Sequence, residues 1–337
     1  MKKSTKTRLK ILCIPLSFLL ILAAIGGIGV LRDHIMGESY PSRLDEAEIF
    51  ADGYSGHEPL PQTITAEKIW EHYNSPLPEG KSVKKALVIG LDGVRAEMLG
   101  NLKNPERSGI LTIKEMGGGV YPIIAGKIWD EGFGAWSKEQ KTFTLPGWTT
   151  TLTGEWADVH GVFDNSRSSY DKNPLPETVF TRLYKAGLLN EADFIVNWDG
   201  HLTNKNKARP FALESQSTQR NGYNINWTKV GIDWQTFTTA RRRLEEGSDF
   251  VFLILEYNDD LGHRTAGFGN HSPFYRWAFA HGDRRAKQLI DTVLARPSYE
   301  EEDWLFIIVS DHGGHGWSHG KFRPVERLIF VASNKEF

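Results

Sequence analysis

The chain has 337 residues and a mass of 38.1 kDa, and 40% of its residues are hydrophobic and 24% are charged. A chain of this composition can bury a substantial core, which excludes the disordered, collagen-like and coiled-coil classes of protein. Its length suits one large domain or two ordinary ones. The single cysteine excludes an intrachain disulfide and any Cys-x-x-Cys motif, and the net charge of −2 gives no basis for binding a nucleic-acid duplex.

The N-terminus has the pattern of an export signal. Residues 1–31 carry five basic residues and no acid, and residues 11–31 form an uncharged apolar run. A helix of that length spans about 30 Å, the thickness of a bilayer hydrocarbon core. Because basic flanks stay in the cytoplasm, the sequence predicts a signal anchor over residues 1–31, in a single-pass membrane protein whose catalytic domain is extracytoplasmic. The alternative is a cleaved signal peptide, with Ala24-Ile25-Gly26 as the cleavage site, which would make the protein secreted.

The remainder divides into a predicted stalk and a predicted domain. Residues 32–83 are polar and contain five prolines, which favour turns over a packed core and indicate an extracytoplasmic stalk. Apolar runs then alternate with helical stretches, which predicts an α/β catalytic domain over residues 84–337, with a mostly parallel central sheet sandwiched by helices. The runs are 86–91, 193–196, 250–255, 304–309 and 328–332, and the helical stretches are 178–186, 237–245 and 274–295. Residues 199–232 are rich in Asn, Lys, Gln and Ser and are interpreted as a polar insertion, either a loop or a small cap.

Carboxylates and imidazoles follow three of the predicted strands. In open parallel sheets, ligands bind beyond the carboxyl ends of the strands, so these side chains are expected at one edge. Together, His and Asp suit zinc, and several such ligands with open positions suit a catalytic metal site. The candidates are Asp92 after the first strand, Asp259, Asp260 and His263 after the third, and Asp311, His312, His315 and His319 after the fourth.

Thr144 is a candidate nucleophile. It precedes Pro146, a residue that suits the first turn of a helix. A hydroxyl at a helix N-terminus lies in positive potential beside free N–H groups that can hold an anion. A nearby zinc ion would lower the pKa of the hydroxyl and make it a nucleophile. The alternative is that Thr144 only caps the helix.

Five motifs occur in a familiar order. They are Asp92-Gly93-Val94-Arg95, Thr144-Leu145-Pro146, Asp164-Asn165, Asp259-x-x-Gly262-His263 and Ser310-Asp311-His312-Gly313. In this arrangement the chain resembles the type I phosphodiesterase/nucleotide pyrophosphatase branch of the alkaline phosphatase superfamily. The resemblance covers about residues 84–333 and implies an alkaline-phosphatase-like fold.

The resemblance also implies a site with two zinc ions, although phosphopentomutase-like relatives use manganese. The ligands of one ion would be Asp92, Thr144, Asp311 and His312, and those of the other Asp259, His263 and His319. Some bacterial members have the pattern Asp-His-Gly-Gly-x-Gly-x-x-His, which His319 matches and His315 does not. Asn165 would bind a non-bridging phosphate oxygen of the substrate.

The implied reaction is a two-metal in-line displacement on a phosphate ester or pyrophosphate, through a phospho-threonine intermediate on Thr144. Nucleotide-cleaving members have a base-stacking aromatic residue after the nucleophile, and this chain has Leu145 there. This departure argues against a nucleotide substrate unless another aromatic residue takes over the stacking, for which the candidates are Trp148, Tyr223 and Trp227. A phosphomonoesterase or phospho-group transferase on the same metals, and a non-catalytic surface binding protein, are the alternatives. A sulfatase is disfavoured because Trp148 stands where its motif needs arginine.

Overall fold

A computed structural model describes residues 16–35, 59–133, 137–166, 176–202 and 210–337. The strands of the main sheet are β1 (Leu60–Pro61), β2 (Val83–Leu91), β3 (Gly119–Ile124), β6 (Ala192–Val196), β7 (Ile225–Lys229), β8 (Phe250–Leu255), β9 (Glu302–Val309) and β10 (Leu328–Ser333), and β4 (Lys127–Phe133) pairs with β5 (Ser137–Gln140). The helices are α1 (Leu16–Ile35), α3 (Ile64–Asn74), α4 (Gly109–Glu115), α5 (Thr144–Thr153), α6 (Ala157–His160), α7 (Val179–Lys185), α8 (Asp199–Leu202), α9 (Ala212–Arg220), α10 (Asp233–Glu246), α11 (Tyr257–Arg264), α12 (Pro273–Leu294) and α13 (Pro324–Arg327), with 3-10 turns η1 (Ala96–Asn101), η2 (Pro105–Arg107) and η3 (Tyr299–Glu301).

The main sheet has the order β1-β3-β10-β9-β2-β8-β6-β7. Its strands from β9 to β7 are mutually parallel, whereas β10 runs antiparallel to both of its neighbours. All five strands predicted from the sequence lie in this sheet, and the three predicted helical stretches correspond to α7, α10 and α12. The predicted fold class, a mostly parallel sheet between helical layers, is therefore confirmed.

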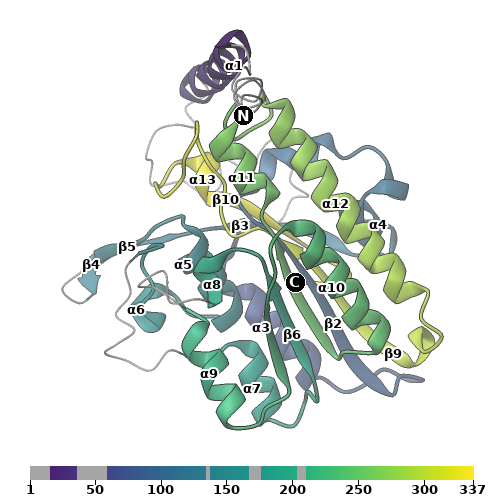
Figure 1. Cartoon of the computed structure of the whole chain (residues 1–337). Coiled ribbons are helices and arrows are strands. Elements are labelled where there is room, and N and C mark those ends of the chain that lie inside the picture. Colours follow the sequence, from purple (N-terminus) through teal and green to yellow (C-terminus); the bar gives the residue numbers. More distant parts are fainter. Residues whose placement is uncertain (1–15, 36–58, 134–136, 167–175, 203–209) are drawn as a thin grey trace, which may run out of the picture.

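The side chains of β2 alternate between the two faces of the sheet, and each face is covered by its own layer of helices. Leu87, Ile89 and Leu91 pack with residues of α4, α10 and α12, whereas Ala86 and Val88 pack with residues of α3, α5 and α7. Successive strand residues point to opposite faces, so a continuous apolar run buries both faces of the sheet. Figure 1 shows α10 and α12 on one side of the sheet and α3, α5 and α7 toward the other.

Two segments differ from their predicted roles. Residues 60–74, assigned to the stalk, form β1, which pairs with β3, and α3, whose Ile69 and Tyr73 are buried in the core. Within the predicted insertion, residues 225–229 form β7, the parallel edge strand beside β6. The strand residues of these segments, 60–61 and 225–229, are short and lie at the two edges of the sheet, so their apolar periodicity is faint in the sequence.

The apolar helix α1 has 20 residues, and among the described residues it alone is long and apolar enough to cross a membrane. It begins within the predicted apolar run and continues past Leu31 to Ile35. The carboxylate of Asp33 is buried and accepts two hydrogen bonds of 3.2 Å from the guanidinium of Arg95. The C-terminal end of α1 is therefore attached to the turn that follows β2.

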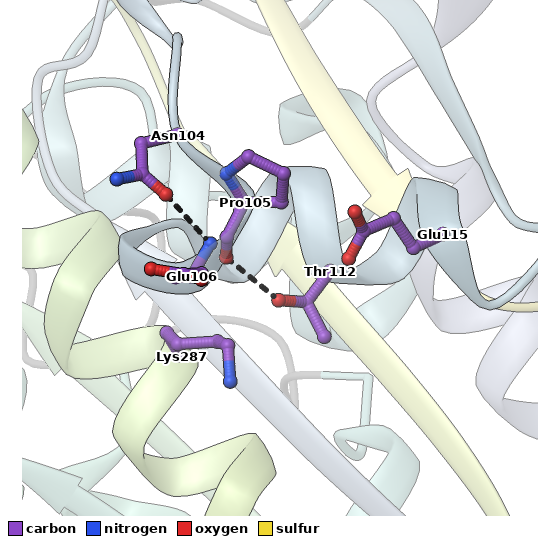
Figure 2. A pocket seen from close by; sticks show the side chains of 6 residues that line it. All are labelled: Asn104, Pro105, Glu106, Thr112, Glu115 and Lys287. Carbon is purple, nitrogen blue, oxygen red and sulfur yellow. Dashed lines mark hydrogen bonds between the residues drawn. The ribbon is translucent and has the colours of Figure 1, made fainter.

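A surface cavity of about 580 Å³ lies between η2, α4 and α12 (Figure 2). Its wall carries charges of both signs, from Glu106, Glu115 and Lys287. Asn104 caps η2 by accepting from the N–H of Glu106, and Lys287 pairs with Asp291. These contacts occupy the side chains of Asn104 and Lys287.

The buried side chain of Glu214 links α9 to α7, and its ionisation should make the stability of the fold depend on pH. Burial raises the pKa of Glu214 from 4.5 to about 7, even though Thr178 and Thr181 donate hydrogen bonds to it. The raised pKa means that this acid stabilises the fold fully below pH 4.5, and that the contribution is lost as the pH rises through about 7. The glutamine of Glu214→Gln cannot ionise. Relative to wild type, the free energy of unfolding of this variant should therefore rise between pH 5 and pH 8, by up to roughly 3 kcal/mol, and its Tm should rise with it. Thermal melts of both proteins across this range test the point, and a constant difference would contradict it.

Candidate active site

The predicted ligands gather at the carboxyl end of the parallel strands. Asp92 directly follows β2, and Asp311 and His312 follow β9. Asp259 and His263 lie on α11, a helix that begins two residues beyond the end of β8. Gly93, at φ +70°, lets the turn after β2 approach α11, since a Cβ there would lie 2.9 Å from the Cβ of Asp259.

A first cluster surrounds the ring of His312. Its Nε2 atom lies 3.6 Å from Asp92 Oδ1 and 3.3 Å from Asp311 Oδ2. The hydroxyl of Thr144 lies 3.3 Å from the same nitrogen. The four residues predicted to surround one ion are thus brought together.

A second cluster surrounds Asp259. Its Oδ2 lies 3.4 Å from His263 Nε2, and its Oδ1 lies 3.4 Å from His319 Nε2. The rings of His319 and His312 stack with centroids 4.0 Å apart, so the two clusters are contiguous. His315 lies outside both clusters, with its Nε2 3.8 Å from Asp33.

The three clustered histidines share one orientation. In each ring, Nδ1 faces a backbone carbonyl: that of Trp317 for His263, Gly313 for His312 and Thr142 for His319. A carbonyl can only accept, so Nδ1 carries a proton in each ring and Nε2 faces the cluster, where it can present a lone pair to a metal once it is deprotonated. This is how metal-binding histidines are usually held. Without a metal, the hydrogen bond to Asp259 raises the pKa of His263.

The carboxylates leave acceptor atoms unused. Among the described residues, Asp92 Oδ1, Asp259 Oδ1 and Asp311 Oδ2 are buried without a hydrogen-bond partner. Burial raises the pKa of Asp92 and of Asp311, and neighbouring carboxylates raise both further. Such crowded oxygens need positive charge to remain ionised, and the adjoining imidazole nitrogens complete a donor set that fits zinc.

Thr144 begins α5 but does not cap it. The N-cap position belongs to Phe143, and no side chain caps the helix there. The N–H of Leu145 donates to the side-chain oxygen of Asn165 at 3.0 Å, which holds this amide beside the helix N-terminus. The hydroxyl and the amide of the two predicted residues therefore line one pocket, of about 550 Å³.

Trp148 has a different role from the one considered for it. It is fully buried, so it cannot stack on a ligand, and its indole N–H donates to Asp92 Oδ2 at 2.8 Å. The ring passes over Gly90, where a Cβ would lie 2.5 Å from it. Trp148 therefore orients Asp92 and leaves Oδ1 of that residue facing the cluster.

The aromatic residues of the pocket are others than those considered from the sequence. Tyr223 and Trp227 pack against the core, whereas Trp198 and Tyr257 line the pocket. Tyr257 is stacked on Trp277, with centroids 6.2 Å apart. The pocket is therefore lined by one aromatic residue from the turn after β6 and one from α11.

Sequence reasoning also missed two polar residues, the buried His201 and the partly buried Glu256. Glu256 directly follows β8, and His201 lies five residues beyond the end of β6. The rule that ligands lie beyond strand ends would have found both, had it been applied to every strand.

Comparison with solved structures gives low similarity. An inactive form of murine ectonucleotide pyrophosphatase/phosphodiesterase 5 in complex with AMP is 18% identical, with a TM-score of 0.42, over 68% of this chain and 57% of that chain. The C-terminal periplasmic domain of EcEptC from Escherichia coli, in complex with Zn, is 10% identical, with a TM-score of 0.44, over 76% and 74% of the two chains. Lipoteichoic acid synthase LtaP from Listeria monocytogenes is 11% identical, with a TM-score of 0.42, over 79% and 71%. At these TM-scores the similarities carry no argument for fold or activity.

Comparison with the curated proteins gives no match. The family model for type I phosphodiesterase/nucleotide pyrophosphatase matches residues 86–329, which span the sheet from β2 to the start of β10 and include every clustered residue. The chain therefore belongs to the type I phosphodiesterase/nucleotide pyrophosphatase family of enzymes.

Proposed function

We propose that the chain is a zinc-dependent hydrolase of phosphate esters or pyrophosphates that works through a phospho-threonine on Thr144. The observation that carries the proposal is the position of the Thr144 hydroxyl, which lies at a helix N-terminus, 3.3 Å from His312 Nε2. Asp92, Asp311 and His312 would hold one ion, and Asp259, His263 and His319 the other. When bound, the ions would supply the positive charge that lowers the pKa of the hydroxyl and stabilises the phosphoryl oxygens.

The chain's own residues define the two steps of the reaction. In the first, Thr144 Oγ1 loses its proton to solvent and bonds to phosphorus, and the leaving group departs with the electrons of the broken P–O bond. In the second, a water oxygen bonds to phosphorus, the P–Oγ1 bond breaks, and Thr144 regains a proton. The side-chain oxygen of Asn165 accepts from the N–H of Leu145, so its side-chain NH2 group would donate to a non-bridging oxygen throughout. Trp198 and Tyr257 would contact the leaving group.

Metal content and turnover of a model diester test this function together. We expect the purified full chain to contain zinc at both clusters and to hydrolyse bis-p-nitrophenyl phosphate faster than p-nitrophenyl phosphate. Chelation should abolish turnover and zinc should restore it. Full activity without metal would overturn the proposal. A faster monoester would favour a phosphomonoesterase on the same site, and bound zinc without turnover would favour a binding protein.

We also propose that residues 1–31 act as a signal anchor and that the catalytic domain lies outside the cytoplasm. The charge pattern before α1 and the length of that helix support this orientation. Protease added to intact cells should then degrade the catalytic domain. Protection of the domain until the cells are lysed would show that the orientation is reversed.

A further inference from the structure

The C-terminal half of α1 packs against neighbouring loops through one face. Gly26, Gly29 and Asp33 are the buried residues of this helix, and their spacings of three and four place them on the same side of it. Ile28 and Leu31, on the opposite side, are exposed. The helix therefore turns its small and charged residues inward, and its large apolar residues lie on the outer surface.

Two rings lie directly against the glycines of this face. Gly26 contacts the indole of Trp317 and Gly29 contacts the imidazole of His271, so closely that a Cβ at either glycine would overlap the ring. By contrast, a Cβ at Gly27 would meet nothing within 4 Å. The rings can approach the helix backbone only because both contacting residues lack a side chain.

A buried ion pair fixes the end of the same face. The carboxylate of Asp33 has no exposed surface and accepts two hydrogen bonds of 3.2 Å from the guanidinium of Arg95, which is also buried. Arg95 donates in addition to the carbonyl of Phe268, whose own N–H donates to the carbonyl of Gly316. A buried guanidinium that loses its carboxylate is strongly destabilised, so Asp33 stabilises the junction of these two loops.

Trp317, the residue that contacts Gly26, also holds part of the second cluster. Its carbonyl faces Nδ1 of His263 at 2.7 Å, and its indole N–H donates to the carbonyl of Thr265, directly after the helix that carries His263. In the chain, Trp317 lies two residues before His319. A displacement of Trp317 would therefore move the supports of both histidines of that cluster.

We propose that the C-terminal half of α1 positions the second cluster, because it holds Trp317 in the place from which this residue orients His263 and His319. Gly26 and Asp33 are positioning residues in this arrangement and touch neither the substrate nor the ion. The inference rests on the proposed function, since it requires an ion at the second cluster. The membrane anchor would then be part of the site and not only a tether.

The zinc affinities of two matched glycine variants test the proposal. In the full chain, purified in detergent with zinc, Gly26→Leu should weaken one of the two ions by about 10-fold to 100-fold, the usual effect of losing a group that holds a metal-binding histidine. Turnover of bis-p-nitrophenyl phosphate should fall in parallel and return when zinc is in excess. Gly27→Leu adds the same side chain to open space and should behave as wild type. Competition with a chelator measures the affinities.

Asp33→Asn is an independent second variant, because it removes the charge opposite Arg95 without adding volume. It should weaken the same ion, and it decides the question if Gly26→Leu does not fold.

Each outcome bears on the inference. Two ions held as tightly as in wild type by both Gly26→Leu and Asp33→Asn would overturn it and leave the proposed function standing. An equal loss of both ions from Gly26→Leu, or a rate that excess zinc does not restore, would also overturn it, because the effect would then be a general loss of structure. A wild type without zinc would overturn this inference and the proposed function together.

Discussion

Thr144→Ala is expected to lower the turnover of a phosphodiester by at least about 10³-fold, because it removes the atom proposed to bond to phosphorus. Zinc content should be unchanged, since the carboxylates and imidazoles of both clusters remain. Thr144→Ser keeps a hydroxyl and should retain part of the rate. Steady-state rates and metal analysis of the same preparations measure both effects.

Thr149 provides the matched control for this substitution. It lies on the same helix, is equally buried, and donates its hydroxyl to the carbonyl of Leu145. Thr149→Ala should cost about 1 kcal/mol of stability and leave the rate nearly intact. Thr142 serves less well, because its hydroxyl bonds to the segment that carries His319. A folded, zinc-loaded Thr144→Ala enzyme with near wild-type turnover would instead favour direct attack by water.

Asp259→Asn should reduce turnover by roughly 10³-fold and release one of the zinc ions, because the amide carries no charge and only one oxygen. Asp259 contacts both His263 and His319, so its loss leaves the second cluster without a carboxylate. Burial alone would raise the pKa of Asp259, but these histidines hold it below its usual range. Zinc analysis and diester kinetics measure the two effects.

The neighbouring Asp260 is the control for this carboxylate. Its side chain is 40% exposed and pairs with Arg264 at 2.8 Å, and although it lines the same pocket it belongs to neither cluster of potential ligands. Asp260→Asn should therefore retain every ion. If Asp259→Asn keeps its full zinc content, the assignment of the second cluster is wrong.

The sequence predicted the central strands well because each is a continuous apolar run with a polar residue at its carboxyl end. That pattern predicted that Asp92, Asp311 and His312 lie at one edge of the sheet. Only residues that follow other strands at the same edge could then lie close to them. Edge elements were harder to predict. A two-residue strand such as β1 has no period, and β7 is half-exposed, so their pairing depends on neighbours that are distant in the chain.

The parts of the site that the sequence did not reveal are mostly contacts. Trp148 was considered as a surface for a base, and only the packing of α5 against β2 shows that it donates to Asp92. Tyr257 and Trp198 carry no motif, and their position in the pocket depends on how α11 and the turn after β6 are oriented. His201 and Glu256 had the right place in the sequence pattern but no partner that local spacing could reveal.

Gly90 has no side chain, and the ring of Trp148, which donates to Asp92 at the edge of the sheet, occupies the space above it. A methyl group at this position would press on the indole of Trp148, and the ring cannot yield without pulling its N–H away from Asp92. Added volume inside this core strand should therefore lower thermal stability, by roughly 1–3 kcal/mol, and also weaken the affinity for an ion at the proposed site. A mutational screen that measures abundance alone would record the first effect and miss the second.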